Sequence, residues 1–221
     1  GKLVCSSIVG KNGWHGTFSI DEGRNCIMFA EYPANKSSDE HKSNSRVLRS
    51  LDNGLNWESV LEIDYPKIRH FHTCSSIPKK DSHWLVTSGD NPDQSRFWLS
   101  KNDGDTWAEI TEIDPIPEME FLTSKRSIHR TVVMGFHENY LYWATDDILG
   151  KPENFEKGTG RGKVGSKLMR CEIPGESISP EIVCSLGMHI RSMIDVGKAW
   201  IFISEAKCLE QVKGPQVFIV F

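Results

Sequence analysis

The sequence predicts an all-β protein, a β-propeller of about four four-stranded antiparallel blades. Short runs rich in Val, Ile, Phe and Trp, separated by Gly, Asn, Asp and Pro, dominate its 221 residues, whereas helical patterns are scarce. Four kinds of run then recur in the same order, and radial repetition of a four-stranded unit builds a propeller. A β-sandwich also has short strands, but it gives no reason for matched positions to recur in every unit.

The first two runs of each unit carry charges at matched positions. The first runs are WHGTFSI, FHTCSSI, HRTVVMG and IRSMIDV, whose second residues are His15, His72, Arg130 and Arg191. These basic residues lie 57, 58 and 61 positions apart. The second runs are NCIMFAE, WLVTSGD, YLYWATD and AWIFISE, which end in Glu31, Asp90, Asp146 and Glu205. Third and fourth runs, such as SRVLRS and ESVLEI, complete the unit.

The repeats divide a single propeller domain, 1–221, into blades at about 14–63, 71–113, 129–185 and 190–221. The last blade lacks a fourth run, and KLVCS near the start of the chain resembles EIVCS of the third blade. We therefore expect strand 2–8 to complete the last blade and close the ring, which removes exposed sheet edges. The alternative is that the chain is a fragment of a propeller with more blades.

Two turns, SLDNGLNW and SKNDGDTW, share a pattern of Ser, Asp or Asn, Gly and Trp. The matching residues are Ser50, Asp52, Gly54 and Trp57 in the first, and Ser100, Asn102, Gly104 and Trp107 in the second. In such a turn Gly supplies a positive φ, Asp or Asn bonds the local backbone, and Trp packs into the blade.

This pattern resembles S-x-D-x-G-x-T-W, the Asp-box or bacterial neuraminidase repeat of sialidase-like propellers. The chain is also similar, through HFH, SGD, HR and ATDD, to uncharacterised bacterial Asp-box propellers of surface-polysaccharide loci. The resemblance implies a sialidase-like propeller whose boxes lie on the face away from the site. It does not by itself imply a sialidase, because fold and function separate.

Strand alternation places the starts of first strands and the ends of second strands on one face, near the axis. The expected result is a ring of charge pairs: His15 with Glu31, His72 with Asp90, Arg130 with Asp146, and Arg191 with Glu205. One interpretation is a set of structural salt bridges. The other is a polar pocket in which the basic residues bind substrate and the four carboxylates accept hydroxyl bonds or act as general acid and base.

We interpret the chain as a glycan-recognising propeller, and the sequence favours a glycoside hydrolase-like enzyme that acts on an anionic carbohydrate. The alternatives are a non-catalytic carbohydrate-binding propeller and a protein-interaction scaffold. A true sialidase is not expected, because the chain lacks the Arg-Ile-Pro motif of that family and offers two axial arginines where a sialidase uses three.

Composition excludes several other classes. The net charge of −4 argues against nucleic acid as a partner, and no apolar run is long enough to cross a bilayer. The six scattered cysteines suggest buried free thiols, which favour a reducing, cytoplasmic location. No cofactor is expected. No metal is expected either, because His70-x-His72 with Asp90 lacks a third clear nitrogen or sulfur ligand.

Overall fold

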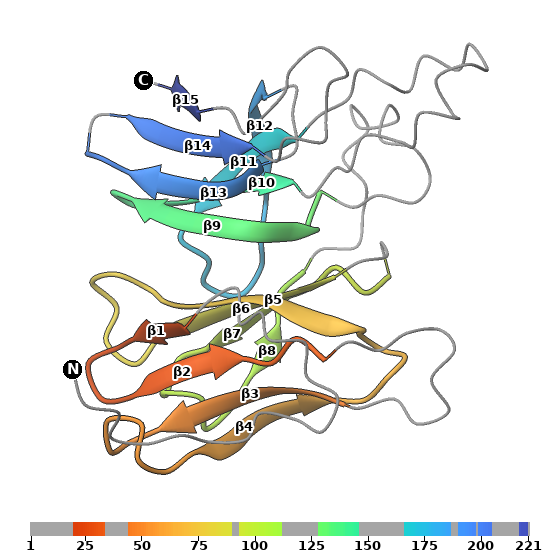
Figure 1. Cartoon of the computed structure of the whole chain (residues 1–221), viewed down its shortest axis with the longest axis vertical. Coiled ribbons are helices and arrows are strands. Elements are labelled where there is room, and N and C mark those ends of the chain that lie inside the picture. The colour runs from red at the N-terminus through yellow and green to blue at the C-terminus, as the bar shows by residue number, and fades with distance from the viewer. Residues whose placement is uncertain are drawn as a thin grey trace. The chain divides into compact units, whose positions relative to one another are not determined.

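The computed structural model describes residues 20–33, 44–89, 93–111, 128–145, 166–186, 190–197, 199–204 and 217–220. Every regular element in these ranges is a β-strand, which confirms the predicted all-β class (Figure 1). The chain divides into two compact units, Gly1–Thr111 (unit 1) and Glu112–Phe221 (unit 2). Each unit contains two antiparallel sheets.

Unit 1 holds two four-stranded sheets in which chain neighbours pair in order. The first sheet consists of β1 (Ile20–Glu22), β2 (Ile27–Ala30), β3 (Ser45–Ser50) and β4 (Glu58–Ile63). The second consists of β5 (His70–Ser76), β6 (Trp84–Gly89), β7 (Phe97–Ser100) and β8 (Ala108–Glu109). These strands lie where the first two blades were predicted, at about 14–63 and 71–113, with β5 beginning one residue earlier, at His70.

Unit 2 repeats the arrangement with one four-stranded and one three-stranded sheet. The first consists of β9 (Thr131–His137), β10 (Tyr140–Thr145), β11 (Lys167–Glu172) and β12 (Glu181–Ser185). The second consists of β13 (Ile190–Asp195), β14 (Trp200–Ser204) and β15 (Val217–Val220). The predicted closing strand 2–8 lies outside the described residues, so closure of the ring stays a prediction.

Each unit packs a tryptophan of its second sheet against a glycine of its first. Trp84 begins β6, and a Cβ built on Gly23 would lie 2.6 Å from its Cζ2 atom. Trp200 begins β14, and a Cβ on Gly135 would lie 2.8 Å from its Cη2 atom. The missing side chain at each glycine makes room for a large indole, which is a main source of apolar burial in the core.

Serines at the starts of third strands bond the beginning of the next sheet. The Ser45 hydroxyl donates to the carbonyl oxygen of Arg69 over 3.2 Å, just before β5. The Ile190 amide donates to the Ser166 hydroxyl over 3.2 Å, at the start of β13. Both bonds span 24 residues, and both serines are buried, so the same connector recurs in the two units.

The turn SLDNGLNW, which we call the first Asp-box turn because it resembles that repeat, follows β3 and is held by side-chain bonds to its own backbone. The Ser50 hydroxyl accepts from the Gly54 amide at 2.8 Å, and the Asp52 carboxylate accepts from the Asn56 amide at 2.8 Å. Gly54 has a φ of 86°. The Asn56 and Ser50 bonds lower the pKa of Asp52. The Trp57 ring packs edge-on against Phe29, with centroids 4.9 Å apart.

The second Asp-box turn follows β7 and repeats this geometry. Ser100 accepts from the Gly104 amide at 2.8 Å, and Asn102 accepts from the Thr106 amide at 2.9 Å. Trp107 packs against the core of unit 1. The turn also contacts the first sheet, because Gly104 lies against side chains of β2 and β4.

These contacts predict different costs for the same substitution in the two turns. Gly54→Ala is expected to lower the free energy of unfolding by about 1 kcal/mol, the cost of a left-handed alanine. Gly104→Ala should cost about 2–3 kcal/mol, because overpacking is added. Its Cβ would lie 3.0 Å from Met28 Cε and 3.1 Å from Val60 Cγ2, whereas the nearest atom to a Cβ at Gly54 is 3.7 Å away. Urea unfolding measures both, and equal losses would contradict the inter-sheet contact.

The four described cysteines are free thiols, and Cys26, Cys74 and Cys171 are buried. Burial raises the pKa of Cys26 and of Cys171 to about 12, so these thiols are poor nucleophiles at neutral pH. The described part of the chain holds no helix of the length and apolarity needed to cross a bilayer.

Candidate functional site

A partly buried ion pair lies where β2 ends and β3 begins. The guanidinium of Arg46 donates from Nε and Nη2 to the two carboxylate oxygens of Glu31, at 2.7 Å each. The Glu31 side chain is 6% exposed and that of Arg46 is 34% exposed. The hydrogen bond to Glu31 raises the pKa of Arg46 despite its partial burial. This bidentate geometry is the strongest form of Arg–carboxylate contact.

An aromatic stack adjoins this pair at the start of β5. The rings of Tyr32 and His70 stack with centroids 3.6 Å apart, and the His72 ring lies 6.0 Å from Tyr32. The Nε2 atoms of the two histidines are 3.1 Å apart, within hydrogen-bond distance. His70 and His72 are buried, whereas Tyr32 is half-buried. We call Glu31, Tyr32, Arg46, His70 and His72 the strand-end cluster.

A glycine makes room for the His72 ring of this cluster. A Cβ at Gly89, the last residue of β6, would lie 3.0 Å from Cε1 of the His72 ring. The strand pairing also shifts between Phe71 and Thr73, so His72 is the extra residue of a β-bulge. Bulges re-aim side chains and are common next to active sites.

Two more of the repeated basic residues, Arg130 and Arg191, lie at or beside a shift in strand pairing in unit 2. Arg191 is the extra residue where pairing shifts between Ile190 and Ser192. Arg130 immediately precedes β9, whose own shift leaves Val132 as the extra residue. The last residue of the second strand pairs with His70 in the β5 sheet, with Thr131 in the β9 sheet and with Ile190 in the β13 sheet. Relative to these residues, His72 lies two positions later, Arg130 one position earlier and Arg191 one position later. The repeated basic residues therefore occupy neighbouring rather than identical register positions.

The structure describes half of the predicted charge ring. Glu31 and His72 are buried in unit 1, Arg130 is half-buried, and Arg191 is exposed. His15, Asp90, Asp146 and Glu205 lie outside the described residues. The four predicted pairs therefore stay predictions, and the described partner of Glu31 is Arg46.

Sequence reasoning missed Arg46, although a signal was present. A serine followed by a basic residue opens the third run in three units, as Ser45-Arg46, Ser95-Arg96 and Ser166-Lys167. Two of these basic residues form ion pairs with acids of their own sheet, Arg46 with Glu31 and Arg96 with Glu109 at 3.3 Å. The recurrence showed that the position mattered, but only the fold showed its partner.

Within the described ranges, no three His, Cys, Asp or Glu side chains gather closely enough to hold a metal ion. What the strand-end cluster offers is a partly exposed guanidinium, a half-buried phenol ring and buried polar groups that support them. These groups suit hydrogen bonding and ring stacking with a polar ligand.

No protein-family model matches the sequence, and no curated protein does. Solved structures do share its fold. The Trypanosoma rangeli sialidase, solved with the inhibitor DANA, matches at 12% identity and a TM-score of 0.56, over 90% of this chain and 30% of that one. A chain of a nidogen–laminin complex matches at 7% identity and a TM-score of 0.53, over 84% of this chain and 55% of that one. At such identities the likeness shows the fold alone, an all-β, propeller-like architecture.

Proposed function

We propose that this protein is a glycan-recognising, Asp-box-type β-propeller, with binding residues in the strand-end cluster of unit 1 and at the equivalent strand ends of the other sheets. The observation that carries the proposal is the Glu31–Arg46 pair beside Tyr32. The pair leaves part of the Arg46 guanidinium exposed, and Tyr32, the residue after Glu31, has a half-buried ring. Groups of both kinds can contact a polyhydroxylated ligand. The propeller-like fold supports the proposal, because the solved structures that share it include a sialidase.

We propose different roles for the site residues according to their burial. Arg191, Arg130 and Arg46 have accessible surface and would bind hydroxyl or acidic groups of the ligand. Glu31 and His72 are 5% and 2% exposed, so they would position neighbouring groups rather than contact the ligand broadly. His15 remains a proposed binding residue.

Non-catalytic binding is the second candidate function, and one observation favours it. Both oxygens of Glu31 accept bonds from Arg46, so this carboxylate is poorly placed to act as a general acid. A glycoside hydrolase needs two carboxylates. In this chain they would come from Asp90, Asp146 and Glu205.

Measurements of glycan binding and of glycan turnover distinguish an enzyme from a non-catalytic binding protein. We expect the wild-type protein to bind acidic glycans on an array, and Arg130→Ala or Arg191→Ala to weaken binding about tenfold, the loss of roughly 1.4 kcal/mol. Lys101→Ala, an exposed change in the second Asp-box turn, should have no effect. Asp90→Ala should abolish release of reducing sugar but keep binding if the protein is an enzyme. Absence of glycan binding by the wild-type protein would contradict the proposal.

A further inference from the structure

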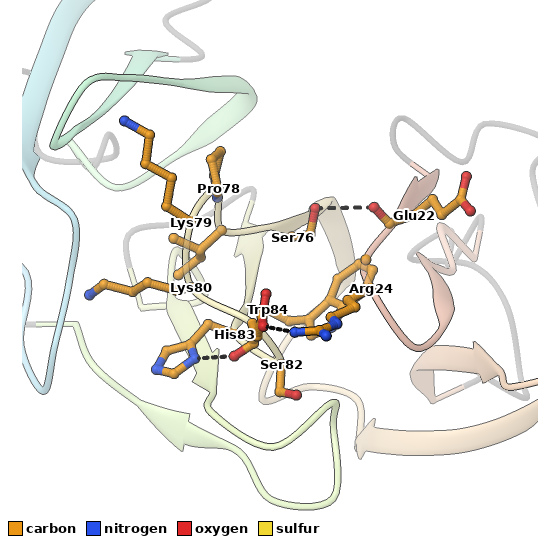
Figure 2. A pocket seen from close by; sticks show the side chains of 12 residues that line it. Glu22, Arg24, Ser76, Pro78, Lys79, Lys80, Ser82, His83 and Trp84 are labelled. Atoms are coloured by element: carbon orange, nitrogen blue, oxygen red, sulfur yellow. Dashed lines mark hydrogen bonds and ion pairs between the residues drawn. The ribbon is translucent and has the colours of Figure 1, made fainter.

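A polar cavity of about 330 Å³ opens in unit 1 between the β1–β2 turn and the β5–β6 turn (Figure 2). Residues 22–24 and 76–84 line it, and we call it the turn cavity. These turns join the strand ends opposite to those that carry the strand-end cluster. The turn cavity is therefore a separate site within unit 1, on the side of the Asp-box turns.

The two walls of the turn cavity are tied together at two points. The Asp21 carboxylate accepts from the amide and the hydroxyl of Ser76, at 2.8 and 2.9 Å. The carboxylate of Asp103, in the second Asp-box turn, accepts from Asn25 at 2.8 Å and from Ser82 at 2.7 Å. The first two bonds join the β1–β2 region to the end of β5 directly, and the other two join it to the β5–β6 turn through Asp103. The cavity is therefore formed before any ligand arrives.

The β5–β6 turn has a backbone that favours anion binding. Lys79 and Ser82 both have a φ of 63°, a left-handed conformation that few residues other than glycine adopt. Left-handed residues in a turn tend to gather successive N–H groups into an anion-binding concavity. The amides of Lys79, Asp81 and Ser82 donate to no acceptor within the part of the chain that the structure describes. Such strain persists mainly where function uses it.

The charges around the turn cavity also favour an anion. Its lining has three cationic side chains, Arg24, Lys79 and Lys80, against the two acids Glu22 and Asp81. Arg24 forms an ion pair with Asp81. Lys79 and Lys80 are exposed and form no ion pair with any described residue. Figure 2 shows both lysine side chains extending from the same side of the turn, with Arg24 on the other wall.

We propose that the turn cavity binds a tetrahedral oxyanion, a sulfate or phosphate group, either free or esterified to a sugar. The amides of the turn supply directional donors, and Lys79 and Lys80 supply neutralising charge. Asp81 opposes binding, because it adds negative charge and holds Arg24. The inference goes beyond the proposed function, since an anion can bind here whether or not the strand-end cluster recognises a glycan.

Amide NMR of the ¹⁵N-labelled full chain, titrated at constant ionic strength, tests the proposal. The probes are sodium sulfate, sodium phosphate, glucose 6-sulfate and glucose 6-phosphate, with sodium chloride and glucose as blanks. We expect saturating shifts at Lys79, Asp81 and Ser82, with a Kd near 1 mM, about −4 kcal/mol. Tighter binding of the esters than of the free anions identifies a sugar-borne group, and equal binding identifies the free anion.

Substitutions of opposite sign sharpen the test. Lys80→Gln should raise the Kd about fivefold, and Asp81→Asn should lower it by a similar factor, because each changes a full charge beside the ligand. Lys101→Gln and Asp93→Asn change the same net charges at exposed positions outside the cavity and should leave the Kd unchanged. Equal effects of Lys80→Gln and Lys101→Gln, or chloride shifts equal to sulfate shifts, would overturn the proposal. Failure of glycan binding at the strand-end cluster would leave these titrations unaltered.

Discussion

Replacing Asp103 by glycine is expected to lower the free energy of unfolding by about 3–4 kcal/mol. The carboxylate of Asp103 accepts bonds from Asn25, Ser82 and the indole of Trp84, the last at 3.1 Å. Bonds to a charged acceptor contribute more than neutral ones, and Trp84 would be left buried without its partner. The same substitution should loosen both walls of the turn cavity.

The equivalent residue of the first Asp-box turn is the matched control. Asn53 also has a left-handed backbone, with a φ of 58° against 51° at Asp103, but its side chain is exposed and makes no bond to any described residue. Glycine is favourable at both backbones, so Asn53→Gly should be neutral or slightly stabilising. The difference between the free energies of unfolding of Asp103→Gly and Asn53→Gly, measured in urea, gives the contribution of the Asp103 side-chain hydrogen bonds. If Asp103→Gly is as stable as Asn53→Gly, the side chain of Asp103 does not stabilise the contact between the two sheets.

The contribution of Asp103 should also depend on pH. Burial raises its pKa, but the bonds from Asn25, Ser82, Trp84 and Cys26 outweigh that effect, so the pKa lies below its usual value. A lowered folded-state pKa gives stability that is present above the unfolded-state pKa and is lost as the pH falls through the folded-state value. The difference in free energy of unfolding between the wild type and Asp103→Gly should therefore become smaller as the pH is lowered into the acidic range, which urea unfolding at several pH values measures.

The second large effect is expected at Arg46. Arg46→Ala should lower the free energy of unfolding by about 2–4 kcal/mol, because it leaves the buried carboxylate of Glu31 without its bidentate partner. The estimate is below that for a fully buried pair, since a third of the Arg46 side chain is exposed. Chemical unfolding measures the loss, and glycan binding should fall in the same variant.

A double variant distinguishes buried charge from lost packing. Glu31→Gln with Arg46→Met removes both charges and should recover most of the stability lost in Arg46→Ala. Arg96→Ala is the matched single control, because its pair with Glu109 is longer, at 3.3 Å, and its partner is more exposed. That variant should lose less than about 1 kcal/mol. If the double variant is as unstable as Arg46→Ala, uncompensated charge is not the cause.

The strand order could be predicted because the repeats encode it locally. Alternation and turn residues located seven of the eight unit 1 strands, and the fourth run EIVCS became β12. The first run, 14–20, shares only Ile20 with β1, and the rest of that run lies outside the described residues. The two Asp-box turns were predictable for the same reason, since each bonds mainly within its own few residues. Local patterns determine such features without knowledge of the fold.

The partners of charged residues could not be predicted in this way. Asp103 lies in the second Asp-box turn, yet three of its donors come from 19 to 78 residues away. The pairing register of β5 with β6 could not be predicted either. A β-bulge makes His72 an extra, unpaired residue, and no residue pattern in the sequence indicates that bulge. Repeat alignment therefore indicated which residues recur but not which groups they contact.

The serine connectors bear on how such a chain grows by duplication. A copied segment of about 60 residues would bring its own third-strand serine, placed 24 residues before the strand that follows. The acceptor or donor in that next strand is a backbone group, so any neighbouring sequence can provide it. A newly inserted sheet would thus arrive already able to attach to the sheet that follows it, without a compensating substitution elsewhere.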